Sequence, residues 1–396
     1  MTLQECNPLK LYICIKLTAN PMKFKRKIID SIEEKFFSGK AILLLGPRQV
    51  GKTTLLRSIL ENRKEKYLYL DGDDPTVVDI LENANTETLR SLIADNQIVY
   101  IDEAQRISKI GIKAKILVDQ FKEVQLLISG SSSFELNQQI QEPLTGRKWT
   151  FNLWPISWGE YEKEAGFLKS EQSLENRLIY GFYPDVINQS RQEEKVLIEL
   201  ADSYLYKDVL MYGNLKKPKL IQDILKALAY QIGHEVKFKE VAETVGADPK
   251  TVASYIEVLE KAFVVFSLSS YSKNLRTEIK TARKIYFYDN GIRNAIIRDF
   301  TPLASRQDVG GLWENFLVSE RLKRNSYQES LARSYFWRTK QQQEIDYVEE
   351  LAGRLAAYEF KWNPKRNPTF PKTFTEEYNS NNLLVNRGNF RGFVGD

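Results

Sequence analysis

A loop bracketed by two glycines, between a short apolar run and a helical stretch, constrains this chain more than any other feature. Residues 41–45, Ala-Ile-Leu-Leu-Leu, are long enough for one buried strand. They lead into residues 46–54, Gly-Pro-Arg-Gln-Val-Gly-Lys-Thr-Thr, which fit the pattern G-x-x-x-x-G-K-[ST] in full, and residues 55–62 have helical character. The order strand, glycine loop, helix predicts a phosphate-binding loop.

The chemistry of a bound triphosphate explains this spacing. Backbone N–H groups must wrap the β-phosphate closely, so glycine is needed at Gly51, where a Cβ would intrude. The helix that follows directs the positive end of its dipole at the phosphates. Lys52 is expected to reach the β- and γ-phosphate oxygens, and Thr53 to offer its hydroxyl to Mg²⁺. The residues predicted to bind ATP are Gly46, Pro47, Arg48, Gln49, Val50, Gly51, Lys52, Thr53 and Thr54.

A second apolar run ends in two carboxylates. Residues 98–101, Ile-Val-Tyr-Ile, are followed by Asp102 and Glu103. Two carboxylates at the end of a buried strand are costly unless a cation or a reaction uses them. The pair resembles the one in P-loop enzymes, and this resemblance implies that Asp102 holds Mg²⁺ through water and that Glu103 polarises the attacking water. A solvated strand end is the alternative interpretation.

Two further runs complete a predicted parallel sheet. Residues 67–71 form one, and residues 124–129 form the other and continue into Gly130 and Ser131. Ser131 is expected to sense the γ-phosphate or to position water, with a plain serine-rich turn as the alternative. Alternating strands and helices predict an α/β fold of the P-loop NTPase kind, with its site at the carboxyl edge of the sheet.

Residues 40–160 resemble the AAA-type ATP-binding domain that is widespread in bacteria and archaea. The resemblance rests on the glycine loop, a D-E-A-Q segment, a G-S-S turn, and a later G-R followed by P-I-S-x-x-E at residues 155–160. It implies ATP hydrolysis with Mg²⁺. It also implies that Arg147 stabilises charge, in cis or across a homo-oligomer interface, with a surface or ion-paired arginine as the alternative.

The middle of the chain is expected to be helical. Residues 166–235 predict a helical connector without visible chemistry. Residues 236–300 predict a winged helix-like domain, in which Gly246 makes a turn between two helices and Asp248 caps the second, with Pro249 at its first position.

Two extended runs, residues 263–268 and 284–288, predict a hairpin that resembles a wing. Basic residues on it could contact DNA phosphates, whereas the second helix is only weakly basic. DNA is therefore a candidate partner, and a structural or partner-docking role is the alternative. The basic residues are Lys273, Arg276, Lys280, Arg283 and Lys284.

The last quarter, residues 301–396, resembles the D…E-x-K core of restriction-endonuclease-like folds. Strand alternation places Glu344 and Asp346 on one face of a strand, and it places the Glu-x-Lys pair on one face of the next. If the strands are antiparallel neighbours, two carboxylates could share Mg²⁺ while the lysine orients water. The candidate nuclease site is Glu314, Asp346, Glu359 and Lys361. Beyond it, the chain is expected to be polar and irregular.

A second resemblance covers part of the same region. A domain of unknown function that often accompanies this ATPase carries D-x-G-[IL]-R, E-N and E-I-D. This chain has those motifs at residues 289–293, 314–315 and 344–346. The resemblance brings no established activity with it.

Composition excludes several other classes of protein. The chain has two cysteines, Cys6 and Cys14, and one histidine, His234, so thiolate zinc sites and histidine-based triads are not expected. With 57 basic and 52 acidic residues, the net charge of +5 permits a nucleic-acid partner but does not argue for one. No stretch reaches the roughly 18 to 20 apolar residues of a membrane span, so we expect a cytoplasmic protein without a membrane partner.

These observations leave three functional hypotheses. The first is an ATPase that acts as a nucleotide-driven switch or motor, with DNA as a candidate target. The second is an ATP-controlled, Mg²⁺-dependent nuclease, and the third is an ATP-binding recruitment protein with an inactive nuclease-like domain. The expected segments are 1–21, an extension that precedes a natural start at Met22, then an ATPase domain at 22–165, the connector at 166–235, the winged helix-like domain at 236–300 and the nuclease-like domain at 301–396.

Overall fold

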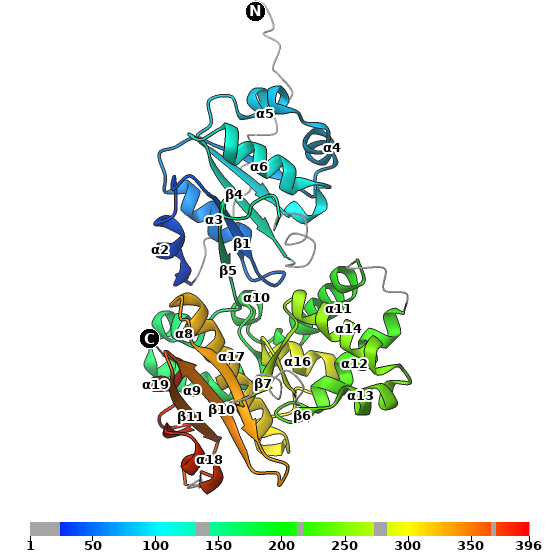
Figure 1. Cartoon of the computed structure of the whole chain (residues 1–396), viewed down its shortest axis with the longest axis vertical. Helices are drawn as coiled ribbons and strands as arrows, with labels where there is room; N and C mark the ends of the chain where they lie inside the picture. The colour runs from blue at the N-terminus through cyan, green and yellow to red at the C-terminus, as the bar shows by residue number, and fades with distance from the viewer. Residues whose placement is uncertain (1–23, 132–141, 212–216, 273–282, 366–369, 396) are drawn as a thin grey trace, which may run out of the picture. The chain divides into compact units, whose positions relative to one another are not determined.

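The computed structural model describes residues 24–131, 142–211, 217–272, 283–365 and 370–395 (Figure 1). It divides the chain into two compact units, Met1–Leu153 (unit 1) and Trp154–Asp396 (unit 2). The predictions for the N-terminal extension and its two cysteines lie outside the described residues. No helix among the described residues combines the length and the apolar character that a bilayer span requires.

Unit 1 is built on a five-stranded parallel sheet. The strand order is β2-β3-β4-β1-β5, and every neighbouring pair is parallel. Helices α3 and α6 both pack against β4 (Figure 1). The elements are α2 (Ile28–Glu33), β1 (Ala41–Leu45), α3 (Lys52–Glu61), β2 (Tyr67–Asp71), α4 (Pro75–Asn83), α5 (Thr86–Ile93), β3 (Ile98–Asp102), the 3-10 turn η1 (Ala104–Arg106), α6 (Ile110–Gln120), β4 (Gln125–Gly130) and β5 (Lys148–Asn152).

The strands predicted from apolar runs are confirmed, and one strand was not foreseen. β1, β3 and β4 are buried along their whole length, as expected for inner strands of a parallel sheet that helices cover. The unforeseen strand, β5, forms the edge next to β1 and is only partly buried. Parallel pairing brings the carboxyl ends of β1, β3 and β4 to one edge of the sheet.

Unit 2 contains a mixed seven-stranded sheet in the order β12-β11-β10-β9-β7-β8-β6. Its elements are α8 (Trp158–Ala165), α9 (Phe167–Tyr180), α10 (Pro184–Asn188), α11 (Glu193–Met211), α12 (Pro218–Tyr230), β6 (Glu235–Val236), α13 (Phe238–Val245), α14 (Pro249–Lys261), β7 (Val265–Ser270), β8 (Arg283–Phe287), α16 (Asn290–Ile297), the 3-10 turn η2 (Leu303–Ser305), α17 (Val309–Tyr327), β9 (Arg333–Arg338), β10 (Glu344–Leu351), β11 (Arg354–Lys361), α18 (Lys372–Glu377), β12 (Ser380–Asn386) and α19 (Arg391–Val394).

The sheet of unit 2 crosses a boundary expected from the sequence. β7 pairs in parallel with β9, with Ser269 opposite Tyr335. The expected segments 236–300 and 301–396 therefore share one sheet, because this pairing joins residues that are far apart in sequence. The compact unit around β1 ends at Leu153 rather than at residue 165, since α8 packs on α9 within unit 2.

The helix-turn-helix pattern has the expected local geometry. Gly246 ends α13 in the left-handed conformation at φ 66°, and the Asp248 side chain accepts a hydrogen bond from the Lys250 N–H at the start of α14. β7 and β8 form the antiparallel hairpin.

The basic residues of the expected wing divide into three groups. Lys273, Arg276 and Lys280 lie outside the described residues. Arg283 is exposed, as expected for a phosphate contact. The expectation for Lys284 is wrong, because it is fully buried on β8, between β7 and β6 in the sheet.

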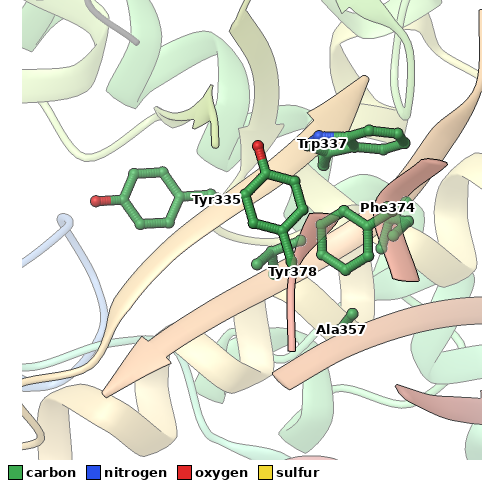
Figure 2. Close-up of a cluster of buried hydrophobic side chains, with 7 residues drawn as sticks. Tyr335, Trp337, Ala357, Phe374 and Tyr378 are labelled. Carbon is green, nitrogen blue, oxygen red and sulfur yellow. The ribbon is translucent and has the colours of Figure 1, made fainter. Parts of the chain in front are cut away.

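Aromatic rings gather on one face of the C-terminal strands (Figure 2). The Trp337 ring on β9 lies 5.0 Å from the Phe374 ring on α18, edge to face. The small Ala357 on β11 is part of the same buried cluster. The chain beyond Lys361 was expected to be irregular, but it forms α18 and then β12, which pairs in parallel with β11. Burial of these rings accounts for its order.

Candidate functional site

The two glycines of the loop are required for different reasons. A Cβ on Gly46 would lie 2.1 Å from the carbonyl oxygen of Leu153, so close approach of the chain after β5 excludes any side chain there. Gly51 has φ 94° at the cap of α3, which other residues rarely adopt. No described atom lies within 4 Å of a Cβ built on Gly51. Conformation, not crowding by the protein, therefore explains Gly51.

The Lys52 ammonium lies within the loop. Its side chain is 5% exposed, and Nζ donates to the carbonyl oxygens of Gly46 and Pro47, both at 2.9 Å. From outside the loop, Arg26 donates to the carbonyl oxygen of Val50 at 3.0 Å. The loop thus encloses a buried cation, and a cation beside main-chain N–H groups suits an anionic ligand.

Thr53 contacts Asp102, and the sequence analysis expected both residues at a magnesium site. Thr53 Oγ1 donates to Asp102 Oδ2 at 2.7 Å, and this bond joins the first turn of α3 to the end of β3. The Tyr69 hydroxyl donates to the same oxygen at 3.2 Å, and Ser129 Oγ donates to Oδ1. Burial, and then the charge of Asp102, raises the pKa of the Tyr69 hydroxyl, so it remains a donor.

Sequence reasoning missed Tyr69 and Ser129 as partners of Asp102. Tyr69 points from β2, the neighbour of β3, and Ser129 lies near the end of β4, the other neighbour. Ser129 could have been identified from the sequence, because it places a hydroxyl at the end of an apolar run, and that run is buried throughout. Tyr69 could not have been identified in the same way, because it lies in a strand whose residues alternate in burial.

Glu103 and Ser131 are brought together by a third residue. Glu103 has φ 45°, a strained conformation for a residue with a side chain, and it follows β3 directly. The Gln105 amide nitrogen donates to Glu103 Oε2 at 2.5 Å and to Ser131 Oγ at 3.1 Å. The chain after β2 approaches closely, since a Cβ on Gly72 would lie 2.5 Å from the Glu103 carbonyl oxygen.

Arg147 does not lie with these residues. Its carbonyl oxygen accepts a hydrogen bond from the Ala41 N–H, so it lies beside the amino end of β1, whereas the loop follows the carboxyl end. Five residues of strand separate the two ends by about 16 Å. The half-exposed guanidinium pairs with Asp119 at 2.6 Å, as in the surface ion-pair alternative.

The expected nuclease residues of unit 2 lie among lysines. Glu314 on α17 accepts hydrogen bonds from Lys284 Nζ and from the Tyr286 hydroxyl, both at 2.7 Å. The same ammonium lies 2.5 Å from Glu344 Oε1. Burial raises the pKa of Glu314 to about 7, although Lys284 opposes this shift. For Lys284 itself, burial is outweighed by the surrounding carboxylates, so its pKa is raised and it stays charged.

The remaining members lie on neighbouring antiparallel strands, which is the condition set for a shared site. Asp346 on β10 accepts a hydrogen bond from the Phe360 N–H at 2.7 Å. Lys361 Nζ lies 2.9 Å from Glu359 Oε2 and 3.7 Å from Asp346 Oδ2. Burial, and then repulsion from Asp346, raises the pKa of Glu359 to about 7.

This arrangement differs from the expected metal site. Within the described ranges, no group of three or more His, Cys, Asp or Glu side chains is placed to hold a metal ion. The carboxylates expected to share Mg²⁺ instead pair with the ammonium groups of Lys284 and Lys361. The expectation missed this because Lys284 was placed on an exposed wing.

The D-x-G-[IL]-R motif has a structural task. Asp289 is buried and accepts hydrogen bonds from the Gly291 N–H at 2.9 Å and the Phe182 N–H at 2.6 Å. Burial raises the pKa of Asp289. A Cβ on Gly291 would lie 2.3 Å from the Tyr180 carbonyl oxygen. The motif therefore caps α16 and ties it to the end of α9.

Three family matches divide the chain. Residues 38–162 match a family described as AAA domain. Residues 171–303 and 309–395 match two families, each described as a domain of unknown function, DUF8612 and DUF4143 respectively.

Similar proteins include several uncharacterized ones. A protein of Mycobacterium tuberculosis is 28% identical over 324 residues, which is 81% of this chain and 70% of the relative. A protein of Methanocaldococcus jannaschii is 23% identical over 346 residues, 82% of this chain and 75% of the relative.

A Walker-type ATPase of Pyrococcus abyssi is a solved structure with 15% identity. Its TM-score is 0.48, over 69% of this chain and 96% of that one. The family match by itself makes the first third of the chain similar to AAA-type ATPases and supports an ATP-binding ATPase, and the two later family matches state no activity.

Proposed function

We propose that this chain binds ATP with Mg²⁺ at the glycine loop of unit 1 and hydrolyses it. The observation that carries the proposal is the 2.7 Å hydrogen bond from Thr53 Oγ1 to Asp102 Oδ2. It joins two sequence motifs that are 49 residues apart, and both belong to one phosphate site if the proposal is right. A chance loop match would not require this meeting.

The residues present fit a magnesium ion. Thr53 and Asp102 offer hydroxyl and carboxylate oxygens, the ligand types that Mg²⁺ prefers. Tyr69 and Ser129 orient the carboxylate from the two neighbouring strands, as outer partners of a metal ligand do. When bound, Mg²⁺ would neutralise charge on the phosphate oxygens.

Lys52 and Glu103 would act on ATP directly. The Lys52 ammonium would exchange two neutral carbonyl acceptors for anionic phosphate oxygens, which attract a cation more strongly. Glu103 would accept the proton of the attacking water. Arg147 lies at the far edge of its own sheet, so its expected role could be performed only in the site of a neighbouring copy, which makes a homo-oligomer part of the proposal.

Hydrolysis would drive a switch or motor, with DNA as the candidate target of the helix-turn-helix segment. Lys250 and Ser254 on α14, and Arg283 on β8, are the accessible polar residues that support this. The alternative of an ATP-controlled nuclease has less support, because lysines neutralise its carboxylates. The same pairing favours the other alternative, an inert recruitment domain.

Phosphate release tests the proposal. Lys52→Ala should lose ATP binding and turnover, whereas Glu103→Gln should bind ATP normally and hydrolyse it roughly 100-fold more slowly. Asp102→Asn should weaken binding more with Mg²⁺ than without it. The assays are calorimetry and phosphate release, with and without single- and double-stranded DNA. Unchanged ATP affinity in Lys52→Ala would end the proposal, and plasmid nicking that disappears in Asp346→Ala would revive the nuclease alternative.

A further inference from the structure

Gln105 is a buried side chain of the same site to which the proposed roles give no task. It lies in η1, two residues after Glu103, and is 8% exposed, while its neighbour Arg106 is exposed. Glutamine is seldom this buried unless hydrogen bonds satisfy its amide. Its contacts therefore indicate what it is for.

The amide nitrogen of Gln105 uses both hydrogens on proposed catalytic residues. Nε2 donates to Glu103 Oε2 at 2.5 Å and to Ser131 Oγ at 3.1 Å. Only the nitrogen end can face a carboxylate, so the orientation of the amide is fixed by its neighbours. Glu103 follows β3 and Ser131 follows β4, which are adjacent strands. One amide thus links the two strand ends that border the site.

The amide oxygen has an unused capacity to accept. Oε1 is buried, and no described residue donates a hydrogen bond to it. A buried carbonyl oxygen without a donor is unfavourable, and such groups in native proteins often have a functional reason. Because the amide is rigid and its nitrogen is held at Glu103, Oε1 lies beside the carboxylate that would take the proton of water. A water molecule has two hydrogens and can donate to both acceptors.

We propose that Gln105 is a further catalytic residue, an inference that rests on the proposed ATP hydrolysis. Its Oε1 accepts one hydrogen bond from the attacking water, and its Nε2 holds Glu103 where it receives the other hydrogen. The water oxygen bonds to the γ-phosphorus, the bond from that phosphorus to the β–γ bridging oxygen breaks, and ADP leaves with the electron pair. The water proton passes to Glu103, and Gln105 gains and loses none.

Two substitutions at Gln105 separate water positioning from ATP binding. Gln105→Leu removes the donor and the acceptor at similar size. We expect its ATP dissociation constant, by calorimetry, to stay within about threefold, and its single-turnover rate with Mg²⁺ to fall roughly 100-fold. Gln105→Glu keeps the oxygens but sets a second carboxylate against Glu103. Its rate should fall similarly at pH 8 and recover in part at lower pH, where the pair shares a proton.

Gln125→Leu is the matched control. Gln125 is also buried, but it lies at the amino end of β4, where it donates to the Lys40 carbonyl oxygen at 3.0 Å. The Gln125→Leu substitution should lower the unfolding free energy and leave the single-turnover rate of the folded protein unchanged. If Gln105→Leu does not fold, the rate and pH profile of Gln105→Glu decide.

The outcomes separate this inference from the function on which it rests. Normal hydrolysis by Gln105→Leu, or equal losses in Gln105→Leu and Gln125→Leu, would overturn the role of Gln105 alone. Absence of hydrolysis by the unaltered protein, or normal hydrolysis by Lys52→Ala, would overturn the proposed function and this inference with it.

Discussion

Two buried lysines, one in each unit, contact acceptors of different charge. Lys52 of unit 1 donates to the main-chain carbonyl oxygens of Gly46 and Pro47. Lys284 of unit 2 contacts the carboxylates of Glu314 and Glu344. A neutral carbonyl oxygen attracts an ammonium group less strongly than a carboxylate oxygen does. An anionic ligand can therefore replace the two carbonyl oxygens as the acceptor for Lys52. Carboxylates already neutralise Lys284, and a ligand would have to displace them.

This difference explains why the two sites are interpreted differently. Each combines lysine with carboxylates near strand ends, which is the chemistry that the sequence offered in both places. In unit 1, the Asp102 carboxylate accepts a hydrogen bond from the neutral hydroxyl of Thr53. In unit 2, the cations lie directly on the carboxylates. The first arrangement suits a ligand, and the second suits stabilisation of the fold.

The largest expected effect comes from replacing Lys284. Lys284→Met leaves Glu314 and Glu344 without their buried cation, which should cost about 3–5 kcal/mol of unfolding free energy. Lys52→Met should cost less than about 1 kcal/mol, because water can solvate the two carbonyl oxygens that the ammonium leaves. Denaturant unfolding followed by tryptophan fluorescence measures both, since Trp149 reports on unit 1 and the other five tryptophans report on unit 2. Equal losses of unfolding free energy in the two variants would contradict the difference between the two lysines.

The second effect is a pH dependence of unit 2. Burial, and then Asp346, raises the pKa of Glu359 to about 7 from 4.5. Between these two pH values, the unfolded chain has released a proton that the folded chain retains, so stability falls as pH rises. The fall through this window should approach about 3 kcal/mol for this group. It should be complete above pH 7 and absent below pH 4.5.

Glu359→Gln tests that sign. The variant should lose its share of the decline in unfolding free energy between pH 5 and pH 7. Glu376→Gln, an exposed position on α18, is the matched control and should keep the decline. A wild-type protein that becomes more stable across this window would show that the lysines outweigh the burial of the carboxylates.

The smallest expected effect is that of Arg147→Ala. Its ion pair with Asp119 is partly exposed, and such pairs contribute about 0–1 kcal/mol. The unfolding free energy should therefore change by less than about 1 kcal/mol, and turnover of isolated subunits should be nearly unchanged. A fall of roughly 1,000-fold in turnover, rescued by mixing with Lys52→Ala subunits, would show that Arg147 acts in a neighbour's site.

Several elements could be predicted because their signals are local. The four apolar runs of unit 1 became β1 to β4, and Asp248 capped α14 as its spacing indicated. β5 escaped prediction, because an edge strand is only partly buried and lacks a continuous apolar run. The position of Arg147 could not be judged without β5, since pairing with β1 is what places it at the far edge.

The residues that surround Asp102 show where local reasoning stopped. Thr53 and Asp102 were both expected at the magnesium site, whereas Tyr69 and Ser129 were not included. Each of the missed residues reaches Asp102 from a neighbouring strand, so its contact depends on strand order. Gln105 was visible in D-E-A-Q, but its bond to Ser131 depends on β3 and β4 being adjacent.

The sequence by itself determined the phosphate loop, since glycine conformation and the order strand, loop, helix are properties of about twenty consecutive residues. The charges that surround Lys284 depend on tertiary structure, because its partners Glu314 and Glu344 are distant in sequence. Lys284 was expected on a wing, but β8 pairs with both β7 and β6 inside a seven-stranded sheet. Pairings between distant segments set the dielectric and the neighbours of a side chain, and those two quantities decide whether a lysine is available to a ligand or holds the fold together.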